Sequence, residues 1–106
     1  MRILFDQGTP APLRHSLIGH LVETAFELGW ATLQNGALLA VAEEAGFEVF
    51  VTTDKNLKYQ QNLDARSISI VVLSTTSWPR IRLALSDIVA AVESAVPGGY
   101  SEVLVK

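Results

Sequence analysis

The stretch Glu48-Val49-Phe50-Val51-Thr52-Thr53-Asp54 decides the fold, because an apolar strand runs directly into an acidic residue. The N-terminal segment Arg2-Ile3-Leu4-Phe5-Asp6 repeats the pattern. Short apolar runs of this kind are typical of buried strands. In parallel α/β sheets, ligands bind beyond the carboxyl ends of the strands. Two carboxylates at one such edge are the oxygen ligands that a hard cation such as Mg²⁺ prefers, so the pair predicts a metal site.

The rest of the chain alternates predicted strands with predicted helices. We expect further strands over 20–25, 68–73 and 100–105, and helices over 10–18, 35–45 and 77–96. The polar segment 55–63 is expected to be a short helix or an ordered loop. Thr9 and Asn35 are the expected N-caps of the first two helices. The last helix has an apolar stripe at helical spacing from Ile81 to Val96. This alternation predicts an α/β fold, with a mainly parallel sheet of four to five strands and helices on both faces, as a single domain over 1–106.

Composition limits the classes of function. The chain has 106 residues, 49% of them hydrophobic, and no cysteine, which excludes disulfides and thiol chemistry. No secretory signal and no apolar run of membrane-spanning length is visible, so a soluble cytoplasmic protein is expected. The net charge of −3 lacks the basic footprint of a dedicated nucleic-acid binder. Any contact with RNA must therefore be local or bridged by metal ions.

Four side chains are candidates for one shared site. Asp6, Asn35 and Asp54 each lie where a strand meets the following helix, and Asn56 lies two residues beyond Asp54. Each also has a structural explanation. Asp6 can cap the turn at Gly8-Thr9 or pair with Arg14, while Asp54 and Asn35 can cap helices. Convergence at one sheet edge is what favours the functional interpretation.

Polar neighbours supply the predicted substrate contacts. These are Gln7, Thr53, Lys55 and Gln60. Gln60, Gln61 and Asn62 form a polar run that can hydrogen-bond bases or a partner, or can be an ordinary surface loop. Glu43 and Glu44 lie more than two helical turns from Asn35, so we expect them to be solvated charges at the opposite edge.

The order and spacing of four motifs resemble a known family. They are Ile3-Leu4-Phe5-Asp6-Gln7 with Pro10, then Gly19-His20, then the Asn35-Gly36 helix with Ala42 seven residues on, and last Val51-Thr52-Thr53-Asp54-Lys55-Asn56-Leu57. Over residues 1 to about 73 the chain resembles the short PIN-like domains related to VapC toxins. The last motif is similar to the Thr-x-Asp-x-Asp-Phe signature of that family, with Asn56 in place of Asp and Leu57 in place of Phe.

The resemblance implies a PIN-like three-layer sandwich and a Mg²⁺- or Mn²⁺-dependent ribonuclease. Asp6 and Asp54 match metal-binding acids of the family, whereas Asn35 and Asn56 stand where it usually has aspartates. An asparagine keeps a carbonyl oxygen but removes a charge, and cation affinity depends on the charge of the ligands. Two carboxylates favour a site for one metal ion over a site for two.

Three functions remain open on this sequence. The first is a metal-dependent ribonuclease, as the toxin of a toxin–antitoxin pair, with Asp6, Asp54, Asn35 and Asn56 at its centre. The second is a catalytically inactive PIN-like module that binds a partner protein or RNA. The third is a different α/β binding domain, for example of receiver type. This chain, however, has no second acid beside Asp6 and no lysine at the end of a late strand, as a receiver domain would need. RNA, an antitoxin protein and a second copy in a homodimer are the expected partners, and no membrane.

Overall fold

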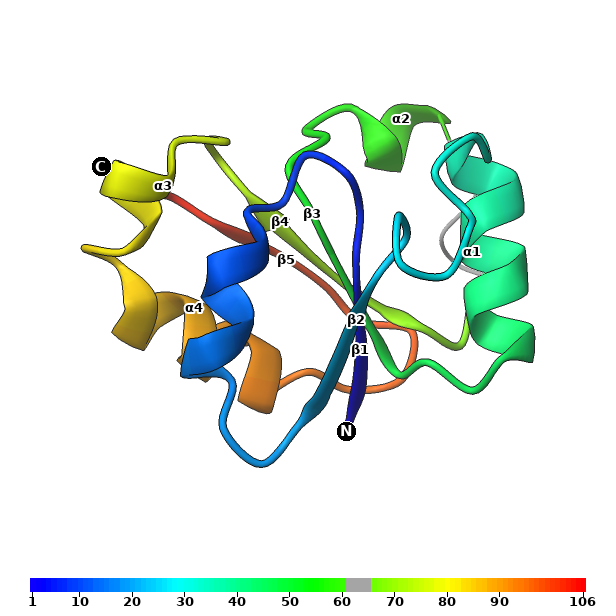
Figure 1. Ribbon diagram of the computed structural model, residues 1–106, viewed down its shortest axis with the longest axis horizontal. Coiled ribbons are helices and arrows are strands. Elements are labelled where there is room, and N and C mark those ends of the chain that lie inside the picture. Colours follow the sequence, from blue (N-terminus) through cyan, green and yellow to red (C-terminus); the bar gives the residue numbers. More distant parts are fainter. Residues whose placement is uncertain (61–65) are drawn as a thin grey trace.

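The computed structural model describes residues 1–60 and 66–106 and contains one five-stranded parallel sheet (Figure 1). Its strand order is β2-β1-β3-β4-β5. The strands are β1 (Arg2–Phe5), β2 (Leu21–Thr24), β3 (Val49–Thr52), β4 (Ser69–Leu73) and β5 (Tyr100–Val103). All four pairings are parallel. The predicted α/β fold with a parallel sheet is confirmed, while the PIN-like three-layer arrangement stays a prediction.

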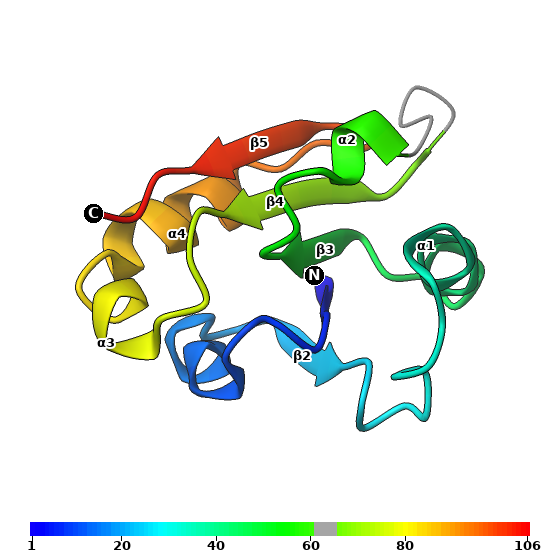
Figure 2. The same cartoon turned by 90° about the horizontal axis from the view of Figure 1, so that it is seen from above.

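Helices cover the two faces of the sheet unequally, as Figure 2 shows. One face packs against a 3₁₀-helix, η1 (Ala11–Ser16), together with α3 (Trp78–Ile81) and α4 (Leu85–Glu93). The other face packs against α1 (Asn35–Glu44) and the single turn α2 (Leu57–Gln60).

Burial on both faces explains the apolar strands. Ile3 and Phe5 of β1 contact the core under η1 and α4, while Leu4 between them contacts the core under α1. Every residue of β3 and of β4 is buried. Consecutive side chains of a strand point to opposite faces, so a strand enclosed between two layers is mostly apolar, and its exceptions here, Thr52 and Ser69, are hydrogen-bonded.

The first predicted helix is a 3₁₀-helix, and Thr9 does not cap it. Pro10 occupies the capping position, and no side chain caps the helix. The Thr9 hydroxyl instead donates to Asp6 Oδ1 at 2.7 Å and to the carbonyl of Val51 at 3.0 Å. Contacts of the Thr9 hydroxyl with Asp6 in the same turn and with strand β3 therefore replace the capping bond that the sequence suggested.

The prediction of one continuous helix over 77–96 is wrong, because this segment forms two helices, α3 and α4. Leu83 and Ala84 donate backbone hydrogen bonds three residues back, to Arg80 and Ile81, which tightens the chain between the two helices. The Arg80 side chain bonds the carbonyls of Val105 and Lys106 and ties α3 to the end of the chain. These contacts are tertiary, and neither glycine nor proline marks the break.

Glu43 is another correction, since it is not a solvated charge. Its carboxylate lies 2.7 Å from Arg66 and accepts hydrogen bonds from the backbone N–H and hydroxyl of Ser67. It thereby holds the segment that enters β4. Glu44 is exposed, as expected.

None of the helices within residues 1–60 and 66–106 has the length and apolar character needed to cross a membrane.

Candidate functional site at the carboxyl edge

The two aspartates follow the strands at which the sheet changes its direction of winding. From β1 the chain crosses to β2 on one side, whereas β3, β4 and β5 extend the sheet on the other side. Asp6 directly follows β1, and Asp54 lies two residues after β3. The loops after both strands emerge at the same end of the sheet (Figure 1). In open α/β sheets this switch point is the place where ligands bind.

Asp6 is held by hydrogen bonds from neutral donors. Its Oδ1 accepts from the Thr9 N–H at 3.1 Å and from the Thr9 hydroxyl at 2.7 Å. Its Oδ2 accepts from the Thr52 hydroxyl. The capping of the Gly8-Thr9 turn by Asp6 is therefore correct, while the proposed pairing with Arg14 is wrong, because Arg14 binds Glu27 at 2.7 Å.

Thr52 links the two aspartates. This residue is fully buried, and its hydroxyl donates to Asp6 and accepts from the Asp54 N–H at 3.1 Å. The sequence pattern had indicated the neighbouring Thr53 instead. Only the position of Thr52 on β3, with its side chain directed toward Asp6, distinguishes the two threonines, and the sequence alone carries no such signal.

Asp54 joins Asn35 and the start of α2. Its Oδ2 accepts from Asn35 Nδ2 at 2.7 Å, and its Oδ1 accepts from the Asn56 N–H at 3.0 Å. Asn35 does not cap α1 as predicted, because Gln34 occupies the capping position and Asn35 is the first helical residue. The Asn35 side chain thus points into the site, which is where the functional interpretation placed it.

The negative charge of the pair is not compensated by a neighbouring side chain. Within the described part of the chain, no lysine, arginine or histidine forms an ion pair with Asp6 or Asp54. Both residues are only partly exposed. Uncompensated carboxylates attract cations, and the attraction strengthens where the surroundings exclude water.

The loop carrying Asp6 lies unusually close to the end of β3. A Cβ added at Gly8 would lie 2.5 Å from Thr53 Oγ1 and 3.9 Å from Asp6 Oδ1. Only glycine therefore fits this position without displacing Thr53. The role of Thr53 seen here is to pack against the turn beside Asp6.

Three hollows lie along the carboxyl edge, and predicted site residues line each of them. Asp6 and Gln7 line a cleft of about 870 Å³. Both also line a smaller hollow of about 160 Å³ together with Asn35. Lys55 and Asn56 line a third hollow of about 520 Å³ over β4 and β5.

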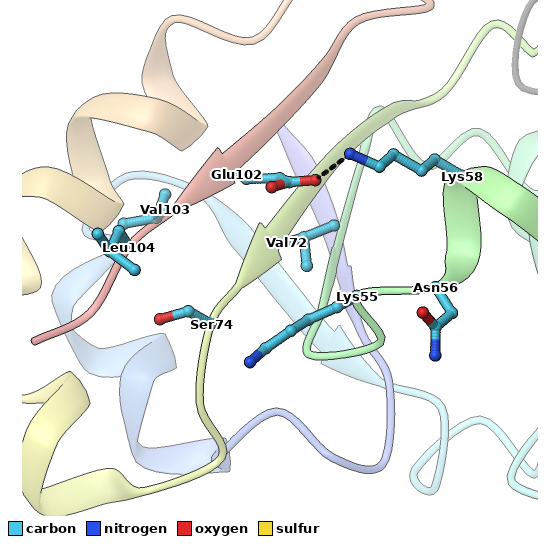
Figure 3. A pocket seen from close by; sticks show the side chains of 8 residues that line it. All are labelled: Lys55, Asn56, Lys58, Val72, Ser74, Glu102, Val103 and Leu104. Atoms are coloured by element: carbon cyan, nitrogen blue, oxygen red, sulfur yellow. Dashed lines mark hydrogen bonds and ion pairs between the residues drawn. The ribbon is translucent and has the colours of Figure 1, made fainter.

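Figure 3 shows the third hollow, where Lys55 extends toward Ser74 and the side chain of Asn56 points the other way. Lys58 pairs with Glu102 at 2.9 Å, and the hydroxyl of Tyr100 donates to the same carboxylate at 2.9 Å. These bonds lower the pKa of Glu102.

Of the predicted site residues, Asp6, Asp54 and Asn35 share one hydrogen-bond network, and Asn56 joins it through its backbone N–H. The side chains of Gln60, Gln61 and Asn62 lie outside the described residues.

The donor set fits one hard cation. An ionised carboxylate has about four acceptor positions, and the described residues use three on Asp6 and two on Asp54. Free positions therefore remain on both residues, more of them on Asp54. Among the described residues, no group of three or more His, Cys, Asp or Glu could enclose a metal. A Mg²⁺ ion held by these residues would need its further oxygen ligands from substrate and water.

Comparisons with known proteins found no relative of this chain. No protein-family model matches the chain, and neither the curated proteins nor the solved structures give a match.

Proposed function

We propose that the carboxyl edge around Asp6 and Asp54 binds one Mg²⁺ or Mn²⁺ ion and cleaves RNA, as a metal-dependent ribonuclease with a reduced acidic site. One observation carries the proposal: two carboxylates follow β1 and β3 at the switch point, share Thr52, and form no ion pair within the described residues. The resemblance to PIN-like domains supports the same chemistry. In that context the protein is the toxin of a toxin–antitoxin pair, and an antitoxin protein is its partner.

The residues around the carboxylates have separate tasks in this proposal. Thr52 and Thr9 fix the orientation of Asp6. Asn35 orients Asp54 through its amide N–H, at 2.7 Å. A bound cation supplies neutralisation of phosphate charge and activation of water.

The substrate supplies what the protein lacks. With only two carboxylates, further oxygen ligands come from the phosphate of the RNA. Lys55 is exposed beside Asp54 and offers a positive charge to the neighbouring phosphate. Gln7 is exposed beside Asp6 and offers an amide to the substrate.

The test is cleavage of a mixed single-stranded RNA pool with Mg²⁺ and with Mn²⁺. Wild type is compared with Asp6→Asn/Asp54→Asn and with Glu44→Gln/Asp87→Asn, which removes the same charge at exposed positions away from the site. Metal-dependent cleavage by wild type and by the control variant, but not by the site variant, supports the proposal. Absence of cleavage by wild type, or equal cleavage by all three proteins, contradicts it.

A non-catalytic binding module is the second candidate, favoured by the hydrogen bonding of Asp6. Three donors already occupy that carboxylate, as they would in a purely structural aspartate. This candidate predicts that Asp6→Asn keeps the fold and the binding of a partner protein or RNA. Robust turnover of RNA by the wild type would rule it out.

A further inference from the structure

The cleft of about 870 Å³ is lined by Asp6, Gln7 and Thr9 and by further residues that the proposed chemistry does not use. Three chain segments form it: the turn and η1 residues from Asp6 to Arg14, the end of β2 with its following loop, and the entry to α3. Ligand pockets in proteins typically measure about 300–1,000 Å³. We call this hollow the aromatic cleft, and its residues that matter here are Asp6, Arg14, Phe26, Glu27, Thr76 and Trp78.

Two aromatic rings in the cleft come from different segments. Phe26, on the loop after β2, is 75% exposed. Trp78, at the start of α3, is half-buried and packs against the core on one side. Exposed rings of this kind are the surfaces on which proteins stack unpaired bases.

The charges of the cleft select against phosphate. Arg14 makes two hydrogen bonds to the carboxylate of Glu27, at 2.7 and 3.3 Å. Chiefly through the bond from Arg14, the pKa of Glu27 falls to about 2, so this carboxylate stays ionised near neutral pH. With Asp6 also lining the cleft, the negative charges outnumber the positive one. A neutral planar group is therefore favoured over an anion.

We propose that the aromatic cleft binds one unpaired nucleobase of a single-stranded RNA, stacked on Phe26 and Trp78. Thr76 and Gln7 supply hydrogen-bonding groups at its rim. One part of this proposal rests on the proposed function: the sugar–phosphate attached to the bound base continues toward Asp6. The base, not the phosphate, is the element recognised in the cleft.

The test is a titration with adenosine, followed by NMR of the two tryptophan indole N–H groups with EDTA present. Trp78 lines the cleft, whereas Trp30 packs edge-to-face on Phe47 with ring centroids 6.0 Å apart and serves as an internal control. We expect a saturable shift of the Trp78 signal, little change at Trp30, and no effect of ribose alone. Equal small shifts of both tryptophans, or the same response to ribose, would overturn the proposal.

Variants locate the binding. Phe26→Ala should weaken adenosine binding about tenfold, whereas Phe26→Tyr should retain most of it, because the ring remains. Ile18→Ala is the matched control, since Ile18 is 85% exposed and does not line the cleft. Wild-type affinity in Phe26→Ala would contradict the stacking.

Adenosine 5′-monophosphate tests the argument from charge. Without metal it should bind no more tightly than adenosine, because Asp6 and Glu27 repel the phosphate. Tighter binding would mean that the cleft recognises phosphate and would overturn the assignment. Because these titrations contain no divalent cation, failure of metal binding or of RNA cleavage leaves their outcome unaffected.

Discussion

Glu43, near the amino end of the sheet, and the aspartates Asp6 and Asp54, at its carboxyl end, are held by different kinds of partner. At the amino end, Glu43 pairs with Arg66 at 2.7 Å and accepts further bonds from Ser67, so its charge is balanced and its acceptors are used. At the carboxyl end, Asp6 and Asp54 are oriented by hydroxyl, amide and backbone N–H donors. No ion pair to either residue exists within the described part of the chain.

Under the proposed function, this difference distinguishes a structural acid, Glu43, from two metal-binding acids. A carboxylate that ties two segments together is most stable with a cationic partner and with several donors. A carboxylate kept for a metal ion must be oriented yet retain its charge, which neutral donors achieve. The predictions below test whether the two ends differ in this way.

The largest effect is expected from Thr52→Val, which removes the link within the carboxyl end. The variant deletes the donor to Asp6 and leaves the Asp54 N–H without its partner, at a fully buried position. We expect a loss of about 2–3 kcal/mol in the free energy of unfolding. Urea denaturation measures it, with Thr32→Val at an exposed position as the control. Equal stability of the two variants would show that the link contributes little.

Gly8→Ala tests the close approach between the two loops. Its methyl group would lie 2.5 Å from Thr53 Oγ1, which forces one loop to move. We expect a loss of about 1–2 kcal/mol, in the range of other overpacking changes. In a double-mutant cycle, Thr53→Ala should recover most of this loss, because it removes the clashing oxygen. Additive effects of the two changes would contradict the steric explanation.

Glu43→Gln weakens the contact at the amino end. The two side chains of the pair are 18% and 22% exposed, so we expect a loss of about 1–2 kcal/mol at neutral pH. Burial acts to raise the pKa of Glu43, but the bonds from Arg66, Ser67 and Ile68 outweigh it and lower the pKa below the ordinary value of 4.5.

The sign of this shift fixes the pH dependence. The contribution of Glu43 is complete above pH 4.5 and is lost as the pH falls through its lower folded-state pKa. The stability difference between wild type and Glu43→Gln should therefore narrow in acid. A difference that stays constant from neutral to strongly acidic pH would contradict the assignment.

The smallest effect is expected at Glu27, which pairs with Arg14 on the surface. Its pKa of about 2 means that its contribution is present above pH 4.5 and disappears as the pH falls toward 2. Glu27→Gln should leave stability almost unchanged at neutral pH and high salt, because exposed pairs are screened. A large loss in high salt, measured by urea denaturation, would contradict a surface role.

Patterns within single segments predicted much of the fold. The apolar runs around Phe5, Phe50 and Val71 located the buried strands, because a strand enclosed on both faces is mostly apolar. The break between α3 and α4 could not be predicted, because the apolar stripe continues through it and neither glycine nor proline marks it.

The candidate site shows the same division. Asp6, Asp54 and Asn35 were found from their positions after strands and at a helix start, and the structure joins them in one network. Thr52 was missed, because its importance comes from the direction of one side chain on β3. The assignment of Glu43 as a solvated charge was wrong, because Arg66 approaches it from 23 residues away in sequence.

The most direct measurement of the central claim is calorimetric titration of Mn²⁺ into the protein, compared with Asp6→Asn/Asp54→Asn and with Glu44→Gln/Asp87→Asn. The account predicts one saturable site in wild type and in the exposed-charge control, and its loss in the site variant. Unchanged Mn²⁺ binding in the site variant, or no binding by the wild type at millimolar Mn²⁺, would contradict it.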